Sequence, residues 1–349
     1  MAVDLSKLIV RRKISLEELN DKRVAIDAYN VLYQFLTTIR QQDGTPLMNQ
    51  NGMVTSHLSG LFYRSIDLLE AGIKPIYVFD GMPSILKEKT IQARIRHREE
   101  AYQAWQQAIK DGNMDVARSK AQASARITKD IVASAKKLLD IMGIGYVNAP
   151  SEGEAQASWM CMHRLVDVTA SQDYDTMLFG APLVGRNITV SGRRKLPGKN
   201  IYINVEPELV SLDDTISTLQ INREQLIWIG MMLGTDFNQG IKGIGPKNAL
   251  KIVKEAKSMH EVEEIVKKKY NATFDVNPDE VIDLFNNPEI TKLTLSDIDA
   301  LLFGKLDLDK ILNFMCIEHG FDEQRIEKYA KKAIEIKGSA RQRGIGSWM

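Results

Sequence analysis

The chain has 349 residues, 44% of them hydrophobic, which is enough for two average domains or one large α/β domain with insertions. It contains no run of 18 apolar residues and no signal-peptide pattern, and its two cysteines are far apart. We therefore expect a cytoplasmic protein without a membrane span, a targeting segment or a disulfide framework. The net charge is +1, so the chain as a whole does not have the excess of basic residues that is typical of nucleic-acid-binding proteins. Two segments, 87–98 and 186–199, are nevertheless strongly basic.

Four short apolar runs in the first half of the chain are typical of buried parallel strands. They cover residues 23–29, 74–80, 143–149 and 167–173. Stretches with helical periodicity separate them, at residues 53–71, 84–141 and 153–164. This alternation predicts an α/β fold with a mostly parallel central sheet flanked by helices. Residues 187–190 and 201–205 have the pattern of a basic-tipped hairpin or an edge pair.

The charged segment 84–130 is too long for a single crossover helix. A turn signal, Asp-Gly-Asn at 111–113, divides it into two helices, so we interpret it as a helical insertion. Its basic residues more often indicate a solvated helix face than a site, and they are Lys87, Lys89, Arg94, Arg96 and Arg98. From 223 to 335 the pattern is helical, and the loss of periodicity over 336–349 predicts a mobile tail.

Acidic residues follow all four predicted strands. They are Asp27, Asp80, Glu152, Glu154, Asp173 and Asp175, and Asp236 lies further on, between helical segments. Because the carboxyl ends of parallel strands meet at one edge of a sheet, we expect these acids to converge. Each acid alone has a simpler explanation as a turn or helix cap, and Ser151 with Glu154 matches a capping box.

A convergence of six or seven carboxylates predicts a metal centre, because like charges this close together need cations. The set contains no histidine or cysteine, which favours Mg²⁺ or Mn²⁺ over zinc. Two such ions most often serve phosphoryl transfer. Lys87 or Arg94 would then stabilise charge on the scissile phosphate.

The loop GIKGIGPKNA, residues 240–249, opens a helix. Gly243 and Gly245 allow close approach of a phosphate, and Lys247 and Lys251 add positive charge. The pattern favours sequence-independent binding to the backbone of duplex DNA over an ordinary turn between two helices. In the tail, Gln342, Ile345 and Trp348 would share one face of a helical turn, as in a short anchor for a partner groove, although eight-residue tails match such a pattern readily by chance.

Taken together, six ordered segments resemble the archaeal-type flap endonucleases of the structure-specific 5′-nuclease superfamily. The segments are AIDAYNVLYQFL from residue 25, TSHLSGLFYRSI from 55, GIKPIYVFDGMP from 72, APSEGEAQA from 149, TASQDYDTMLFG from 169 and GTDFNQGIKGIGPKNA from 234. The resemblance runs from about residue 1 to the tail. It implies a nuclease core over 1–335, with a helical arch at 84–130 and a helix–two-turn–helix at 223–260, and a clamp-binding tail at 336–349.

The resemblance also implies roles for individual residues. The seven carboxylates would bind two divalent ions, Lys87 and Arg94 would act on the scissile phosphate, and Tyr33 would stack beside the reacting nucleotide. Arg40 and Arg64 would contact the duplex beyond the flap. The tail would dock on a sliding clamp of the proliferating cell nuclear antigen type, and the protein would be a monomer.

The sequence departs from the family pattern at three places. Ala2 stands where relatives commonly have glycine, and the tail ends in Trp348-Met349 rather than two aromatic residues. Gly240 stands where relatives often have a serine, a side-chain ligand for a monovalent cation, so a potassium site here would have to use backbone carbonyls.

The predicted function is therefore a metal-dependent 5′ flap endonuclease and 5′–3′ exonuclease acting in DNA replication and repair. Two alternatives remain at this point. A ribonuclease of the related PIN-type fold shares the acidic crevice but does not need the arch or the glycine loop. A non-catalytic clamp-bound scaffold that recognises DNA junctions does not need all seven acids.

Overall fold

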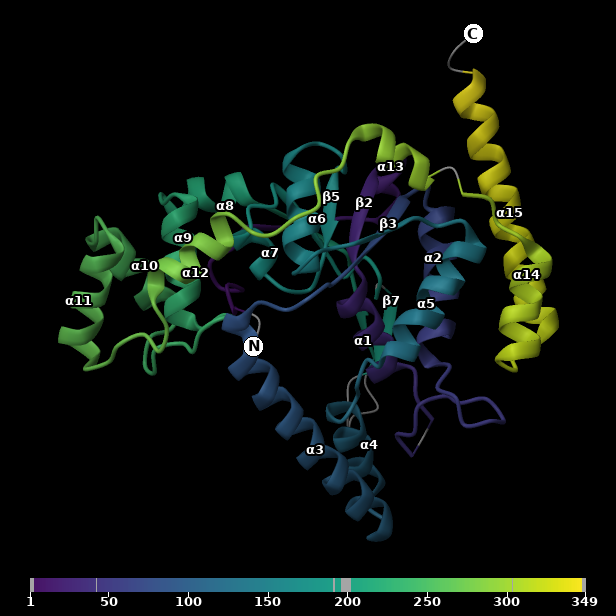
Figure 1. Ribbon diagram of the computed structural model, residues 1–349, viewed down its shortest axis with the longest axis horizontal. Helices are drawn as coiled ribbons and strands as arrows, with labels where there is room; N and C mark the ends of the chain where they lie inside the picture. The colour runs from purple at the N-terminus through teal and green to yellow at the C-terminus, as the bar shows by residue number, and fades with distance from the viewer. Residues whose placement is uncertain (1–2, 42, 191, 196–201, 303, 347–349) are drawn as a thin grey trace.

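The computed structural model describes residues 3–346 except for positions 42, 191, 196–201 and 303. Within these residues, seven strands form a central sheet in the order β1-β9-β6-β5-β2-β3-β4 (Figure 1). The strands are β1 (Arg11–Lys13), β2 (Arg23–Asp27), β3 (Lys74–Phe79), β4 (Tyr146–Asn148), β5 (Val168–Ala170), β6 (Leu183–Arg186) and β9 (Glu208–Ser211). The five strands from β6 to β4 pair in parallel, while β9 pairs antiparallel with β6 and β1. The predicted mostly parallel sheet is confirmed.

The two faces of the sheet bury alternate residues of each strand. Val24, Ile26 and Tyr77 belong to a core shared with the helices on one face, whereas Ala25 and Ile76 belong to the core on the other face. This period of two, with both faces buried, explains why the strands read as continuous apolar runs. The covering helices are α1 (Ala28–Thr38), α2 (Ser56–Glu70), α5 (Lys129–Met142) and α15 (Glu323–Gly346) on the first face, and α6 (Gly153–Met162) and α13 (Leu295–Leu302) on the second.

A third core holds the helical region at the left of Figure 1 together. It is built by α7 (Asp175–Leu178), α8 (Leu212–Leu219), α9 (Arg223–Leu233), α10 (Pro246–Glu255), α11 (Met259–Tyr270) and α12 (Pro278–Asn286). The remaining elements are α14 (Leu308–Leu312), the short 3₁₀ helices η1 (Leu16–Leu19) and η2 (Ile85–Lys87), and the π-helical turn η3 (Asn313–Glu318).

Two helices project from the sheet at the bottom of Figure 1. They are α3 (Glu88–Lys110) and α4 (Met114–Ala123), and they form an antiparallel pair. The chain reverses at Gly112, which has a φ of 70°, and the Asn113 side chain caps α4 by accepting a hydrogen bond from the Val116 amide. The predicted division at 111–113 is thus confirmed.

Several predicted boundaries are wrong. The strand at 23–29 ends at Asp27 because that residue caps α1, a helix that the sequence pattern did not predict. The hairpin pairs β7 (Gly192–Lys195) with β8 (Tyr202–Val205) instead of using 187–190, where Asn187 has a φ of 59° that interrupts extended structure. The strands β1, β6 and β9 were not predicted, since each has three or four residues and depends on distant partners.

The helix that the sequence pattern ends at residue 335 is longer than predicted, because α15 continues to Gly346. The role of residues 336–349 as a tail stays a prediction. Ile336 packs against the core shared with α2 and α5. The Lys337 ammonium donates hydrogen bonds to the carbonyl oxygens of Met142 at 3.1 Å and Gly304 at 3.0 Å. These contacts extend the helix beyond the last residue whose periodicity is visible in the sequence.

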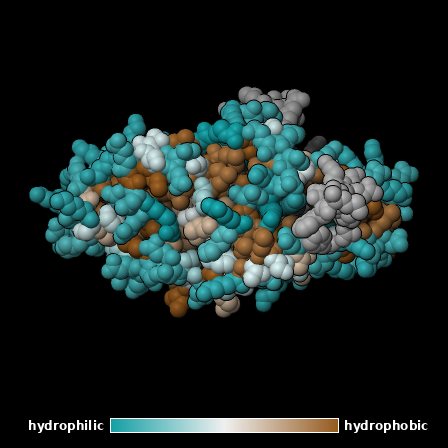
Figure 2. Space-filling model, turned by 90° about the horizontal axis from the view of Figure 1, so that it is seen from above, coloured by the Kyte–Doolittle hydropathy of each residue, from teal (hydrophilic) through white to brown (hydrophobic). Residues whose placement is uncertain are grey.

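The surface seen from above in Figure 2 is mostly hydrophilic, with apolar side chains gathered in separate patches. Among the described residues, no helix combines the length and the apolar character that crossing a membrane requires.

Candidate active site

Two of the predicted carboxylates also cap helices. Asp27, the last residue of β2, accepts a hydrogen bond at 3.0 Å from the Asn30 amide in the first turn of α1. Asp80 follows β3 and accepts one at 2.7 Å from the Gly153 amide, which begins α6. A Cβ atom on Gly153 would lie 2.6 Å from Asp80 Oδ1, so glycine leaves the room that this carboxylate occupies.

The predicted capping box of Ser151 and Glu154 is therefore wrong. The N-cap residue of α6 is Glu152, whose side chain makes no capping bond. Glu154 instead accepts hydrogen bonds from Ser171 Oγ at 2.8 Å and Thr176 Oγ1 at 3.1 Å. These partners turn its carboxylate toward the end of β5, and the amide of Gly153 is satisfied by Asp80 rather than locally.

The remaining acids reach the same place from other segments. Asp173 lies in the turn after β5, and Asp175 is the first residue of α7 and accepts a hydrogen bond at 3.1 Å from the Val3 amide. Asp236 follows α9. Burial, and then the charge of Asp173, raises the pKa of Glu154 well above its usual value.

Burial and neighbouring acids together perturb the pKa values of these carboxylates. Burial and the Asp80 charge raise the pKa of Asp27 to about 8. Burial and the Glu152 charge raise the pKa of Asp80 to about 6, and burial and the Asp236 charge raise the pKa of Asp175 to about 7. Each acid is thus perturbed by an acid from another segment, as expected for like charges that share a desolvated site. The convergence predicted from the strand order is present.

Two basic residues of the inserted helical segment point into this cluster. Lys87 Nζ lies 2.5 Å from Glu152 Oε2 and 3.2 Å from Asp236 Oδ2. Arg94 forms an ion pair with Asp236 Oδ1. Burial raises the pKa of Asp236, but the charges of Lys87 and Arg94 outweigh burial and hold this pKa below its usual value. Burial lowers the pKa of Lys87, but the charges of Glu152 and Asp236 outweigh it and raise this pKa.

The interpretation of the basic residues as a wholly solvated face is therefore wrong. Lys89 and Arg96 are exposed, but Lys87, Arg94 and Arg98 are turned inward. Arg98 lies 5.9 Å from the centre of the Tyr33 ring. The spacing of 7 and 4 residues places the three inward cations on one face of the helical segment.

The donor set fits divalent ions that prefer oxygen. Seven carboxylates share the site with Lys87 and Arg94, so more acidic than basic side chains meet there. With the side chains as they stand, no three His, Cys, Asp or Glu residues of the described chain surround a common point as a metal ion requires. Lys87, between Glu152 and Asp236, occupies part of that space.

The two arginines expected to contact duplex DNA are engaged with the protein. Arg40 donates hydrogen bonds to the carbonyl oxygens of Leu36 at 2.6 Å and Gly44 at 2.7 Å, which ties the loop after α1 to that helix. Arg64 on α2 pairs with Asp67 at 3.1 Å. Their contacts with DNA stay a prediction.

The glycine loop begins α10 as expected. Gly243 has a φ of 90°, and Gly245 is the N-cap residue, which offers no side chain to the first helical turn. Lys247 and Lys251 are exposed on this helix. A Cβ atom on Gly240 would lie 2.3 Å from the Leu233 carbonyl oxygen, so this backbone has no room for a serine side chain.

The tail residues are only partly described. Gln342 and Ile345 lie within α15, and Trp348 lies outside the described residues. Three further residues of the site were not predicted from the sequence. Asn30 donates a hydrogen bond to Asp173, and Ser171 and Thr176 donate hydrogen bonds to Glu154. Their position inside the acidic segments AIDAYN and TASQDYDT is the feature of the sequence that could have identified them.

Comparison with known proteins places this geometry in a family. The chain matches the XPG N-terminal domain over residues 2–101 and the XPG I-region over residues 143–236. Flap endonuclease 1 of Thermococcus onnurineus is 46% identical over 349 residues, which cover 100% of this chain and 99% of that relative. The chain belongs to the flap endonuclease 1 family. All seven carboxylates, with Lys87 and Arg94, lie inside the two matched regions.

Solved structures agree with this assignment. Flap endonuclease-1 from Methanococcus jannaschii is 38% identical, with a TM-score of 0.74, and the match covers 97% of this chain and 99% of that one. The catalytic core of Rad2 in complex with DNA substrate is 25% identical, with a TM-score of 0.68, and the match covers 96% and 100%. The predicted resemblance and enzyme class are confirmed: the protein is a structure-specific nuclease.

Proposed function

We propose that this nuclease cuts DNA with a 5′ flap near the junction of single strand and duplex, using two divalent ions held by its seven carboxylates. The observation that carries the proposal is the gathering of Asp27, Asp80, Glu152, Glu154, Asp173, Asp175 and Asp236 from separate segments into one desolvated cluster. Mg²⁺ is the proposed ion and Mn²⁺ its substitute, since both prefer carboxylate oxygen. Removal of flaps before ligation, in replication and repair, would follow from this activity.

The two ions, when bound, supply an activated water and neutralise charge on the attacked phosphate. The carboxylates orient them, and the desolvated position of Asp27 and Asp175 strengthens every electrostatic interaction there. Lys87 and Arg94 pair with Glu152 and Asp236 when the cluster has no other counter-charge. Once cations neutralise those acids, the two side chains are available to donate hydrogen bonds to the scissile phosphate.

Other residues bind the substrate away from the reacting phosphate. Tyr33 on α1 offers a ring for stacking a base beside the inserted helices. The N-terminus of α10, with Lys247 and Lys251, binds the backbone of the downstream duplex. Both contacts are independent of sequence, so specificity comes from the shape of the DNA and its strand ends.

The tail binds a sliding clamp through Gln342, Ile345 and Trp348. Support for this part comes from the sequence pattern and from α15, which carries Gln342 and Ile345 in a helix at the edge of the molecule (Figure 1). The enzyme itself acts as a monomer.

A substrate comparison tests the proposal. The protein is incubated with a labelled 5′-flap DNA and, separately, with single-stranded RNA, each in excess Mg²⁺ and in EDTA. We expect cleavage of the flap near the junction in Mg²⁺, with a 5′-phosphate on the downstream product, and no cleavage in EDTA. Cleavage of RNA with an intact flap would favour a PIN-type ribonuclease, and DNA binding without cleavage would favour a scaffold.

A further inference from the structure

We propose that Asn30 is a positioning residue that keeps Asp173 beside Asp27 in the carboxylate cluster, where divalent ions would bind. The inference rests on the proposed two-ion site and adds a residue that makes no direct contact with the reacting phosphate. Asn30 lies in the first turn of α1, three residues after Asp27.

Asn30 connects two carboxylates that come from neighbouring parallel strands. Its backbone amide donates a hydrogen bond to Asp27 Oδ1 at 3.0 Å, and its side-chain Nδ2 donates one to Asp173 Oδ2 at 3.3 Å. Asp27 ends β2, and Asp173 follows β5, which pairs with β2. One residue therefore sets the relative position of two acids 146 positions apart in the chain.

The hydrogen bond from Asn30 distinguishes Asp173 from Glu154. In the described part of the chain, the Asp173 carboxylate accepts a hydrogen bond from Asn30 alone, whereas Glu154 accepts two from other side chains. The backbone of the Asp173 turn is held separately. Arg186 on β6 donates a hydrogen bond to the Gln172 carbonyl oxygen at 3.3 Å and contacts the Tyr174 ring. Loss of the Asn30 amide would thus free the carboxylate without releasing its turn.

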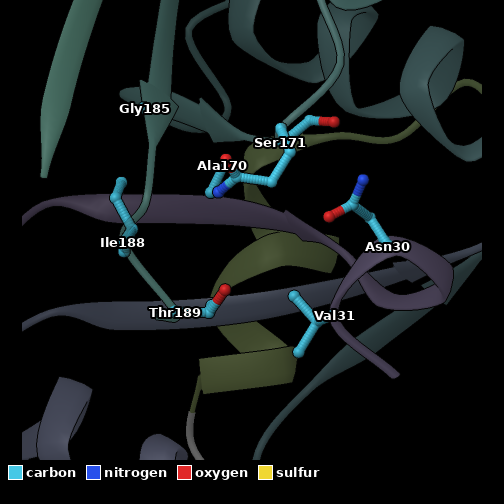
Figure 3. Close-up of a pocket in the computed structure, with 8 residues that line it drawn as sticks. Asn30, Val31, Ala170, Ser171, Gly185, Ile188 and Thr189 are labelled. Carbon is cyan, nitrogen blue, oxygen red and sulfur yellow. The ribbon is translucent and has the colours of Figure 1, made fainter. Parts of the chain in front are cut away.

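The side-chain oxygen of Asn30 indicates which way its amide group is oriented. Its Oδ1 is buried and finds no hydrogen-bond partner among the described residues. It borders a cavity of about 10 Å³, also lined by Ser171 and Thr189, which has room for about one water molecule (Figure 3). Reversing the amide would place this oxygen against Asp173. The nitrogen therefore faces the acid, and the oxygen faces the cavity.

An apolar side chain would fill this position without a buried, unpartnered oxygen. The hydrogen bond that the amide nitrogen donates to Asp173 explains why this position has an asparagine. Residues that orient metal ligands in this way change metal affinity or activity by about 10–100-fold when mutated. We expect the lower end of that range, because six further carboxylates remain.

The test measures ion binding directly as well as activity. Asn30→Leu removes both polar atoms at similar volume, and Asn30→Ser is a smaller second variant in case the first does not fold. Thr189→Val is the matched control, because it changes the same cavity without touching a carboxylate. Mn²⁺ binding to each DNA-free, full-length protein is followed by electron paramagnetic resonance, and flap cleavage is titrated with Mn²⁺.

We expect both Asn30 variants to bind Mn²⁺ about 10-fold more weakly and to need about 10-fold more Mn²⁺ for half-maximal cleavage. Thr189→Val should stay within about twofold of the wild type in both measurements, and all melting temperatures should be similar. Unchanged Mn²⁺ affinity in a folded Asn30 variant would overturn the inference. An equal loss in Thr189→Val would also overturn it, since packing of the cavity would then be the cause.

Failure of the proposed function can be distinguished from failure of the inference about Asn30. If the wild type binds Mn²⁺ but does not cut the flap, flap cleavage is wrong, while the role of Asn30 is still decided by the binding series.

Discussion

Lys87 holds the most informative position of any single side chain in the site. Its ammonium group lies between Glu152 and Asp236, and its side chain is 15% exposed. Lys89, two residues on, is exposed. Charge and helical periodicity alone do not distinguish the two lysines, whereas the family resemblance singled out Lys87, and the structure places Lys87 in the site. Their chemistry is identical, so they form a matched pair for experiment.

Replacing Lys87 with methionine should lower the single-turnover rate of flap cleavage by about 10²–10³-fold, because a cation aimed at the developing charge is lost. Flap binding should change little, since phosphate contacts elsewhere supply affinity. Lys89→Met should cut at close to the wild-type rate. Equal rates for the two variants would show that Lys87 does not act on the phosphate.

Residue identities were easier to predict than residue orientations. Six of the seven acids were identified from their places after strands, because β2 to β5 are parallel and their carboxyl ends share one edge. Asp236, which follows α9, was identified from its sequence segment alone. The partners of those acids were not, because the capping of α6 by Asp80 joins residues 73 positions apart. Local rules favour Ser151 for that role, and no sequence rule finds Asp80.

Among the elements, α10 has the helix start that would bind a phosphate in the proposed function. Gly245 provides no side-chain cap, and Pro246 occupies the first turn, where its missing amide costs little. Lys247 and Lys251 are exposed on the same helix. The element was predicted in full because its signals, glycine, proline and periodic apolar residues, all lie within ten residues.

The double variant Lys247→Ala, Lys251→Ala should weaken binding of flap DNA and lower the slope of log affinity against log salt by about 2, one unit per phosphate contact. The loss should be the same for flaps of different sequence. Lys310→Ala on α14 is the control and should leave both quantities unchanged. A slope equal to that of the wild type would place the duplex elsewhere.

Elements whose stability comes from distant partners escaped prediction. The strands β6 and β9 pair with each other through residues 183–186 and 208–211, too few to produce a pattern. The end of α15 is helical because Ile336 and Lys337 contact the body of the protein. These contacts cannot be predicted from the sequence of the segment, because it contains few apolar residues.

At the scale of the whole molecule, the fold concentrates negative charge without an equal number of cations. Asp27 and Asp175 are buried, and burial with neighbouring acids raises their pKa values to about 8 and about 7. The folded chain therefore binds protons more tightly at these groups than the unfolded chain does. Stability from this source is present below pH 3.8, the usual value for aspartate, and is lost as the pH rises to about 8.

In EDTA, the melting temperature should fall by several degrees between pH 6 and pH 9. Excess Mg²⁺ should remove most of this fall, because bound cations stabilise the ionised acids. Asp27→Asn, which cannot ionise, should show a smaller fall in EDTA. A melting temperature in EDTA that holds steady or rises over this range would contradict the clustering of uncompensated acids.

The central claim, that the gathered carboxylates hold the ions that cut DNA, is tested most directly by Asp175→Ala. The measurement is single-turnover cleavage of a labelled 5′-flap DNA in Mg²⁺, with binding of the same DNA measured in Ca²⁺, and Asp213→Ala on α8 as an exposed control. We predict that Asp175→Ala binds the flap and does not cut it, while Asp213→Ala does both. Cleavage by Asp175→Ala at the wild-type rate would contradict the two-ion assignment.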